Sequence, residues 1–125
     1  VVYPFDPPPR CHFQRAPMLS PLNEKVRRLT RLNIDHACFD EAYVSRSPGE
    51  FIEELQALNP VEIWVGRDFR FGRDRKGVLN ELAAVFNVQV MDPVCCPCGK
   101  VISSTRIRLL IAEGRREEAQ ALLGR

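Results

Sequence analysis

Apolar residues recur at helical spacing in several segments, each bounded by residues that start or stop helices. Ser20-Pro21 has the pattern of an N-cap serine with proline at the first helical position, and it opens a predicted helix over about 21–32. Ser47 followed by Glu50 has the pattern of a capping box that opens the next predicted helix, which Asn59-Pro60 ends. The same periodicity predicts later helices at about 79–86, 104–113 and 115–123, with Gly114 and Gly124 after the last two.

Short runs of β-branched and aromatic residues lie between these helices and predict strands. Val61–Val65 and Val88–Met91 are the clearest. Val1–Phe5 predicts a short buried strand, and His36–Phe39 predicts another. The alternation of strands and helices is typical of an α/β fold, in which helices cover a parallel sheet on both faces. Ligands of such folds bind beyond the carboxyl ends of the strands.

A run of prolines, Pro7 to Pro9, interrupts the pattern after the first predicted strand. Proline fixes φ and has no amide hydrogen, so the run predicts a loop that is not helical. Residues 10–20 are predicted to be irregular, and regular structure is expected to resume with the helix over 21–32.

Length and composition narrow the class of protein. The chain has 125 residues, of which 45% are hydrophobic and 27% charged, as expected for one globular domain. Its 18 basic and 16 acidic residues leave a net charge of +2, which argues against a nucleic-acid partner, and no apolar run is long enough for a bilayer. The five cysteines are an odd number that suits a disulfide framework poorly. We therefore expect a cytoplasmic protein with reduced thiols and no membrane partner, and the oligomeric state stays open.

One segment with candidate chemistry follows the strand predicted at Val61–Val65. It reads Gly66-Arg67-Asp68-Phe69-Arg70-Phe71-Gly72. Gly66 has no Cβ and lets a ligand approach the backbone, and Asp68 can accept hydrogen bonds from a ribose or an amino group. The arginines favour a phosphate ligand. The alternative is a polar loop anchored by Phe69 and Phe71.

A second segment follows the strand predicted at Val88–Met91 and opens a helix. Ser103, Ser104 and Thr105 present amide and hydroxyl groups at the positive end of the helix dipole, which favours an anion. Arg108 lies one turn after Ser104 and can bind phosphate oxygens with both arms of its guanidinium. Arg106 lies about 200° round the helix from Arg108, so the two are not expected to serve one ligand. The alternative is an ordinary serine N-cap.

Several segments, in this order and spacing, resemble one family over nearly the whole chain. They are Val2–Pro9, Leu19–Lys25, Asn33–Asp35, Ser47–Phe51, Val65–Gly72 and Ser103–Arg108. Together they resemble the nucleotidyltransferase domain of bacterial FAD synthase, the adenylylating half of bifunctional riboflavin kinase/FMN adenylyltransferase. The resemblance implies a Rossmann-like nucleotidyltransferase fold over residues 1–125.

The resemblance also implies a reaction, in which the FMN phosphate attacks the α-phosphorus of ATP to give FAD and pyrophosphate. Mg²⁺ is expected to come with ATP, and no metal bound by the protein itself is expected. The implied catalytic residues are Ser104, Thr105 and Arg108; the ATP-binding residues are these three with Gly66, Asp68 and Ser103; the flavin-side residues are Pro7, Pro8, Pro9, Phe69 and Phe71.

The chain departs from the family pattern in two places. Pro8 stands where the family's Pro-His-Pro turn has its histidine. The family's first strand and its His-x-Gly-His motif precede the position that matches Val1, and His12 and His36 are not in that arrangement. The domain is therefore expected to be incomplete at its N-terminus. The resemblance places no riboflavin kinase domain within residues 1–125, so a linked or separate riboflavin kinase is the implied partner.

Three other hypotheses stay open. One is a degenerate protein of the same fold that binds a nucleotide or flavin without turnover, which Pro8 favours. Another is a related nucleotidyltransferase with a different acceptor, such as nicotinamide mononucleotide or phosphopantetheine. The third is a zinc module, for which the candidate ligands are Cys95 and Cys98 with Cys96, Cys11, His12 or Cys38.

Overall fold

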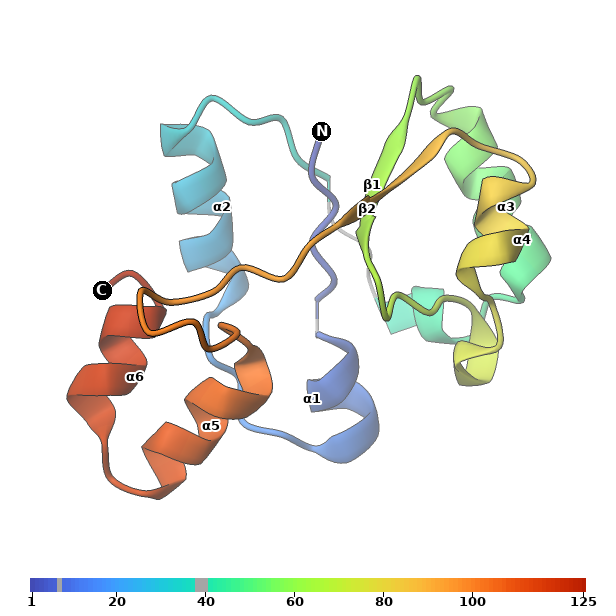
Figure 1. Cartoon of the computed structure of the whole chain (residues 1–125). Helices are drawn as coiled ribbons and strands as arrows, with labels where there is room; N and C mark the ends of the chain where they lie inside the picture. The colour runs from blue at the N-terminus through green and yellow to red at the C-terminus, as the bar shows by residue number, and fades with distance from the viewer. Residues whose placement is uncertain (7, 38–40) are drawn as a thin grey trace. The chain divides into compact units, whose positions relative to one another are not determined.

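A computed structural model of the chain describes residues 1–6, 8–37 and 41–125. Its contacts divide the chain into two compact units, Val1–Met91 and Asp92–Arg125, and each is described by itself. The first unit contains α1 (Pro9–Gln14), α2 (Leu22–Arg31), the 3₁₀ turn η1 (Glu41–Val44), α3 (Pro48–Ala57), β1 (Ile63–Gly66), the 3₁₀ turn η2 (Arg73–Arg75), α4 (Leu79–Ala83) and β2 (Val88–Met91). The second unit contains α5 (Ser104–Ala112) and α6 (Arg116–Leu122), both labelled in Figure 1.

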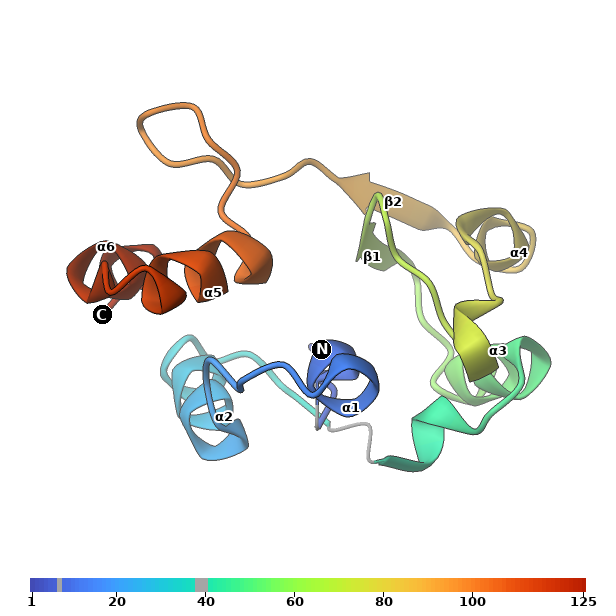
Figure 2. The ribbon, with the colours of Figure 1, turned by 90° about the horizontal axis from the view of Figure 1, so that it is seen from below.

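The core of the first unit lies between a pair of parallel strands and two helices. β1 pairs with β2 in parallel, with Ile63 opposite Val88. Both views show α3 and α4 on the same side of this pair (Figures 1 and 2). The buried core residues are Phe51, Leu55, Phe71 and Leu82, with Ile52, Ile63, Val65, Phe69, Phe86 and Val88 packed against them. The predicted parallel pairing of these two segments is confirmed.

The first predicted strand is not buried. The Val2 amide donates to the Asp35 carbonyl at 2.8 Å, and the Ala37 amide donates to the Val2 carbonyl at 3.2 Å, which makes a parallel bridge between Val2 and His36. Val1 is 78% and Val2 40% exposed, so the expectation of a buried strand is wrong for these two residues. Such a bridge pairs backbone groups without placing an apolar layer over the side chains. Cys38 and Phe39, the end of the next predicted strand, lie outside the described residues, as does residue 40.

The proline run leads directly into α1. The prediction that the run is not helical is therefore wrong for Pro9, and the prediction of irregular structure over residues 10–20 is wrong for 10–14. Pro9 occupies the first helical position, where a missing amide hydrogen leaves no intrahelical bond unmade. The Pro8 carbonyl accepts from the amides of Cys11 and His12 at 2.8 and 3.1 Å. Pro7 lies outside the described residues.

The other helix predictions agree with the structure apart from their ends. α2 begins one residue later than expected, and its N-cap is Pro21 rather than Ser20. The α3 capping box is confirmed: the Glu50 amide donates to Ser47 Oγ at 3.2 Å, and the Ser47 amide donates to the Glu50 carboxylate at 2.6 Å. β1 begins at Ile63 rather than at residue 61, and α4 ends at Ala83, before Phe86.

The second unit is a pair of short helices joined at Gly114. Gly114 has a φ of +77°, the left-handed conformation expected for the glycine that ends α5. Ile107, Leu110 and Ala119 are the buried residues of the two helices, and Cys96 from the preceding loop is buried as well. No helix in the described ranges is long and apolar enough to cross a membrane.

Candidate functional site

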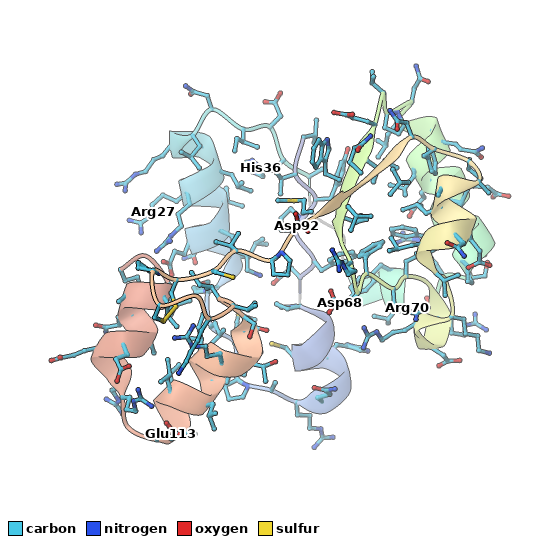
Figure 3. The ribbon with its side chains drawn as sticks, viewed as in Figure 1. Arg27, His36, Asp68, Arg70, Asp92 and Glu113 are labelled. Carbon is cyan, nitrogen blue, oxygen red and sulfur yellow. A yellow bond between two sulfur atoms is a disulfide. The ribbon has the colours of Figure 1, made fainter. Side chains whose placement is uncertain are left out.

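A cleft of about 280 Å³ opens in the first unit beside the segment that follows β1. Five of its ten lining residues are aromatic, and three more carry charge. The lining residues are Phe5, Gln14, Tyr43, Phe51, Asp68, Phe69, Arg70, Phe71, Gly72 and Arg75. Asp68, Phe69 and Phe71 had been singled out from the sequence, and Figure 3 shows Asp68 with Arg70 on this segment.

Stacked rings form the apolar wall of the cleft. Phe71 is 4% exposed and stacks on Phe51, with ring centroids 5.2 Å apart. Phe69 stacks on the Phe71 ring at 6.0 Å. Phe5 and Tyr43 form a second aromatic pair, with centroids 4.6 Å apart and planes tilted by 51°. Because Phe71 belongs to the core, the wall is as fixed in position as the core itself.

The loop after Phe71 is bonded to the chain just before α3. Gly77 and Phe71 exchange backbone hydrogen bonds of 2.8 and 3.3 Å. The Arg73 guanidinium donates twice to the Ser45 carbonyl, at 2.8 and 3.0 Å, and its amide donates to the Arg46 carbonyl at 2.6 Å. These bonds fix where the loop presents Arg75, which has a φ of +57° and lines the cleft.

Tyr43 lines the aromatic side of the cleft and is largely buried. Burial, together with a smaller effect of the neighbouring Cys11, raises the pKa of Tyr43 to about 12. The hydroxyl is therefore protonated at neutral pH and can both donate and accept a hydrogen bond. Sequence reasoning missed Tyr43 and Gln14, because an isolated polar or aromatic residue outside a motif does not indicate which surface it faces.

The proline turn contributes to the cleft through its neighbours. Phe5, before the proline run, and Gln14, the last residue of α1, line the cleft, and the Pro8 carbonyl accepts hydrogen bonds from two amides at the start of α1. The proposed flavin-side role of Pro7, Pro8 and Pro9 stays a prediction. The Gly66 position is open, since an added Cβ would come no closer than 3.5 Å to the Asp68 carboxylate.

In the second unit, the serine-rich segment forms the start of α5. Ser103 is the N-cap, and its Oγ accepts from the Arg106 amide at 3.2 Å. Ser103 therefore caps the helix, and its predicted role in ATP binding stays a prediction. Ser104 and Thr105 are exposed in the first turn, and Arg108 is half-buried one turn further on. Their roles toward a phosphate stay predictions.

Arg106 connects α5 to the loop that precedes it. Its Nη1 donates to Cys96 Sγ at 3.4 Å and to the carbonyls of Lys100 and Val101 at 3.2 Å each. Helical spacing had set Arg106 apart from Arg108, but nothing in the spacing indicated that Arg106 binds this loop.

The cysteine-rich turn contains a disulfide between Cys96 and Cys98, whereas Cys11 and Cys95 are not disulfide-bonded. The expectation of reduced thiols is wrong for this pair. The turn at Pro97 brings the two Cα atoms to 5.3 Å, which is within the usual range for a disulfide. No group of three His, Cys, Asp or Glu side chains in the described part of the chain could hold a metal ion, so the zinc hypothesis gains no support there.

Comparison with known proteins identifies the family. The family model described as FAD synthetase matches residues 1–106. A Geobacillus thermodenitrificans protein named "Putative bifunctional riboflavin kinase/FMN adenylyltransferase" is 50% identical over 127 residues, covering 99% of this chain and 71% of that protein. A Listeria monocytogenes protein named "FAD synthetase" is 36% identical over 115 residues, covering 86% of this chain and 47% of that protein.

A solved structure has the same fold. It is described as "Crystal Structure of Macrolide-efflux Protein from Streptococcus pneumoniae", is 31% identical and superposes with a TM-score of 0.73, covering 99% of this chain and 51% of that one. The chain thus spans about half the length of several proteins that it matches. Its parallel strand pair with flanking helices agrees with a Rossmann-like nucleotidyltransferase fold. The family model covers most of the residues from which the cleft and the start of α5 are built, and the chain belongs to the FAD synthetase family.

Proposed function

We propose that this chain is the FMN adenylyltransferase part of an FAD synthase, which transfers AMP from ATP to FMN and gives FAD and pyrophosphate. The observation that carries the proposal is the family match over residues 1–106, supported by relatives named as FMN adenylyltransferase or FAD synthetase. The aromatic cleft and the serine-rich start of α5 are chemically suited to the two substrates.

The cleft is the proposed flavin site. Phe69 is half-buried and offers ring surface on which a flat aromatic ligand can stack, and the buried Phe71 ring supports it from behind. Gln14 and the protonated Tyr43 hydroxyl can form hydrogen bonds with polar ring edges. Arg70 and Arg75 supply positive charge at the same cleft, which favours a ligand that carries a phosphate.

The start of α5 is the proposed triphosphate site. The amides of its first turn, the hydroxyls of Ser104 and Thr105, and the Arg108 guanidinium are groups that bind phosphate oxygens. Adenylyl transfer needs no covalent enzyme intermediate, so such groups act by positioning the reactants and stabilising charge on the leaving pyrophosphate. Gly66 and Asp68 are the proposed contacts for the rest of ATP. Mg²⁺ would be bound through the ATP phosphates and would neutralise part of their charge.

A second candidate function is binding of a nucleotide or flavin without turnover. Pro8 favours it, because proline cannot supply the imidazole that the family's turn has at this position. The comparisons do not separate this candidate from the enzyme.

Incubation of the protein with FMN, ATP and Mg²⁺, followed by chromatography for FAD and pyrophosphate, separates the two candidates. FAD formation establishes the enzyme. FMN and ATP binding without FAD establishes the binding protein, and the absence of binding rejects both. Replacement of FMN by nicotinamide mononucleotide or phosphopantetheine tests the other acceptors.

The triphosphate site is tested by Arg108→Ala. Loss of a charge-assisted bond to phosphate is expected to weaken ATP binding roughly ten- to hundredfold in calorimetry, with FMN binding unchanged. Arg116→Ala, which removes an exposed arginine from the start of α6, is the matched control. Equal losses in the two variants would show that Arg108 contributes only general positive charge.

The names of the bifunctional relatives suggest a source of the substrate FMN. We propose that a riboflavin kinase, linked or separate, provides FMN to this chain, and that both work in the cytoplasm. Co-purification of tagged chain with riboflavin kinase activity tests the partner.

A further inference from the structure

The loop between β2 and α5 contains a cysteine pair that adenylyl transfer does not use. Cys96 and Cys98 form a disulfide on either side of Pro97. The two sulfurs differ in environment, because Cys96 is only 9% exposed whereas Cys98 is an exposed residue. A thiol from solution therefore reaches the Cys98 sulfur more readily than the Cys96 sulfur.

A positive charge lies against the buried sulfur. Arg106 Nη1 is 3.4 Å from Cys96 Sγ, and its bonds to the carbonyls of Lys100 and Val101 hold it there. A neighbouring guanidinium stabilises a thiolate relative to a thiol, and a more stable thiolate leaves a disulfide faster. The exposed sulfur is thus the one to be attacked, and the buried sulfur is the better leaving group.

We propose that Cys96–Cys98 is a reversible thiol–disulfide exchange site that reacts with a dithiol reductant and in which Arg106 stabilises the leaving thiolate. One thiolate of the reductant bonds to Cys98 Sγ, the bond between the cysteines breaks, and Cys96 leaves as a thiolate beside Arg106. The second thiol of the reductant then displaces Cys98. The reductant becomes a disulfide, and the chain gains two electrons and two protons as two thiols.

The exchange site is joined to the start of α5. Around it, the Cys96 amide donates to the Lys100 carbonyl at 2.9 Å, and the Gly99 amide donates to the Cys96 carbonyl at 2.8 Å. The Lys100 carbonyl also accepts from Arg106, whose own amide is capped by Ser103. Opening the disulfide frees the turn that presents this carbonyl, so the first turn of α5 loses part of its support.

This connection gives the exchange site a regulatory consequence that rests on the proposed function. If the first turn of α5 binds the ATP phosphates, the disulfide form binds ATP more tightly than the dithiol form. The turn is already ordered in the disulfide form, so less conformational entropy is lost when ATP binds. In a cytoplasmic protein, where stable structural disulfides are rare, a pair of this kind is expected to respond to redox conditions.

The exchange itself is tested without nucleotide. The full chain is equilibrated in buffers of graded reduced and oxidised dithiothreitol, quenched with acid, alkylated and mapped by mass spectrometry. Cys96 and Cys98 are expected to become alkylated together as one two-electron couple, while Cys11 and Cys95 are alkylated throughout. Alkylation of Cys96 and Cys98 in the most oxidising buffers, or at different midpoints, would overturn the proposal.

The role of Arg106 is tested by the rate of reduction. Arg106→Ala is expected to slow reduction by dithiothreitol about fivefold, and Arg106→Lys to restore most of the rate, because the charge is what stabilises the leaving thiolate. Arg116→Ala is the control. Circular dichroism shows whether α5 persists in each variant, and an unchanged rate in Arg106→Ala, or a slowed Arg106→Lys that retains its helix, contradicts the assigned role.

The regulatory consequence is tested by calorimetry with ATP. Reduction is expected to weaken ATP binding about fivefold, and Cys98→Ser to show the weaker binding in either buffer. Cys95→Ser, the neighbouring free thiol, is the matched control and should respond to redox as the unaltered chain does. Equal ATP binding in both states overturns the coupling. Absence of ATP binding in both states rejects the proposed function. The exchange site is decided separately, by the alkylation experiment.

Discussion

Two glycines determine how the wall of the cleft is built. A Cβ added at Gly77 would lie 2.5 Å from the Phe71 ring, and one at Gly72 would lie 2.8 Å from the Pro48 nitrogen. Gly72 also has a φ of +71°, which disfavours other residues. The loop therefore closes on Phe71 only because both positions lack a side chain.

Gly77→Ala is expected to displace the Phe71 ring and to lower the free energy of unfolding by about 1–3 kcal/mol, as overpacking does. It should also weaken FMN binding, because Phe71 lines the cleft. Gly49→Ala in α3 is the control, since its Cβ would meet only Ser47 Oγ, at 3.9 Å. Denaturant titration of the two variants measures the difference, and equal stability would contradict the close contact.

Tyr43 provides a prediction about alkaline pH. Its pKa is raised from 10.0 to about 12, so between these pH values the folded chain keeps a proton that the unfolded chain has lost. Stability from this residue is complete below pH 10.0 and is lost as the pH rises toward 12. Unfolding measured across this range should show the loss, and Tyr43→Phe should remove it. Tyr3→Phe is the control. If the loss of stability at alkaline pH persists in Tyr43→Phe, another group causes it.

At the scale of the elements, the N-terminus of α3 is closed by a capping box. The reciprocal bonds of Ser47 and Glu50 satisfy two backbone amides, and the helix then carries Phe51 and Leu55 into the core. Hydrogen bonds from the Ser47 backbone and side chain lower the pKa of Glu50, with Arg73 and Arg46 as smaller causes. A lowered carboxyl pKa means that the folded state favours the ionised form, so this contribution is lost in acid.

Ser47→Ala is expected to lower the free energy of unfolding by about 1 kcal/mol. The contribution of Glu50 is present above pH 4.5, its unfolded value, and is lost as the pH falls through the lower folded pKa. Glu50→Gln should therefore reduce stability at neutral pH and flatten its decline in acid, whereas Glu53→Gln, exposed on the same helix, should leave the decline as it is. Thermal unfolding over this pH range provides the measurement, and identical profiles would exclude the capping box as the source.

At the scale of the molecule, the chain has two compact units with separate small cores. In the first, Leu82 is 0% exposed and lies among Phe51, Leu55 and Phe71. In the second, Ile107, Leu110 and Ala119 are buried. Neither core is large, so single truncations are expected to matter.

Leu82→Ala is expected to cost about 2–5 kcal/mol of stability, because it leaves a cavity in the core that supports the Phe71 wall. Leu58→Ala, at a leucine that is 49% exposed, is the matched control and should cost much less. Chemical unfolding with FMN binding as a second readout tests both, and a small loss in Leu82→Ala would mean that the core relaxes around the cavity.

Local sequence predicted the helices best where the deciding interactions are local. The Ser47–Glu50 box and Gly114 act within a few residues of their helix ends, so spacing alone located them. α1 was missed, because three prolines are read as a loop although one of them can open a helix. The burial expected of Val1 and Val2 depended on neighbouring elements that their own sequence does not specify.

The sequence by itself determined the family, the segments with candidate chemistry and most helix boundaries, since motif spacing and capping are properties of short stretches of chain. Only the tertiary structure decided which residues surround the cleft, because Tyr43 and Gln14 line it with Asp68 and Phe69 although they come from distant segments of the chain. It also decided that Arg106 lies against Cys96 rather than toward solvent, since that contact depends on how the cysteine loop folds back on α5.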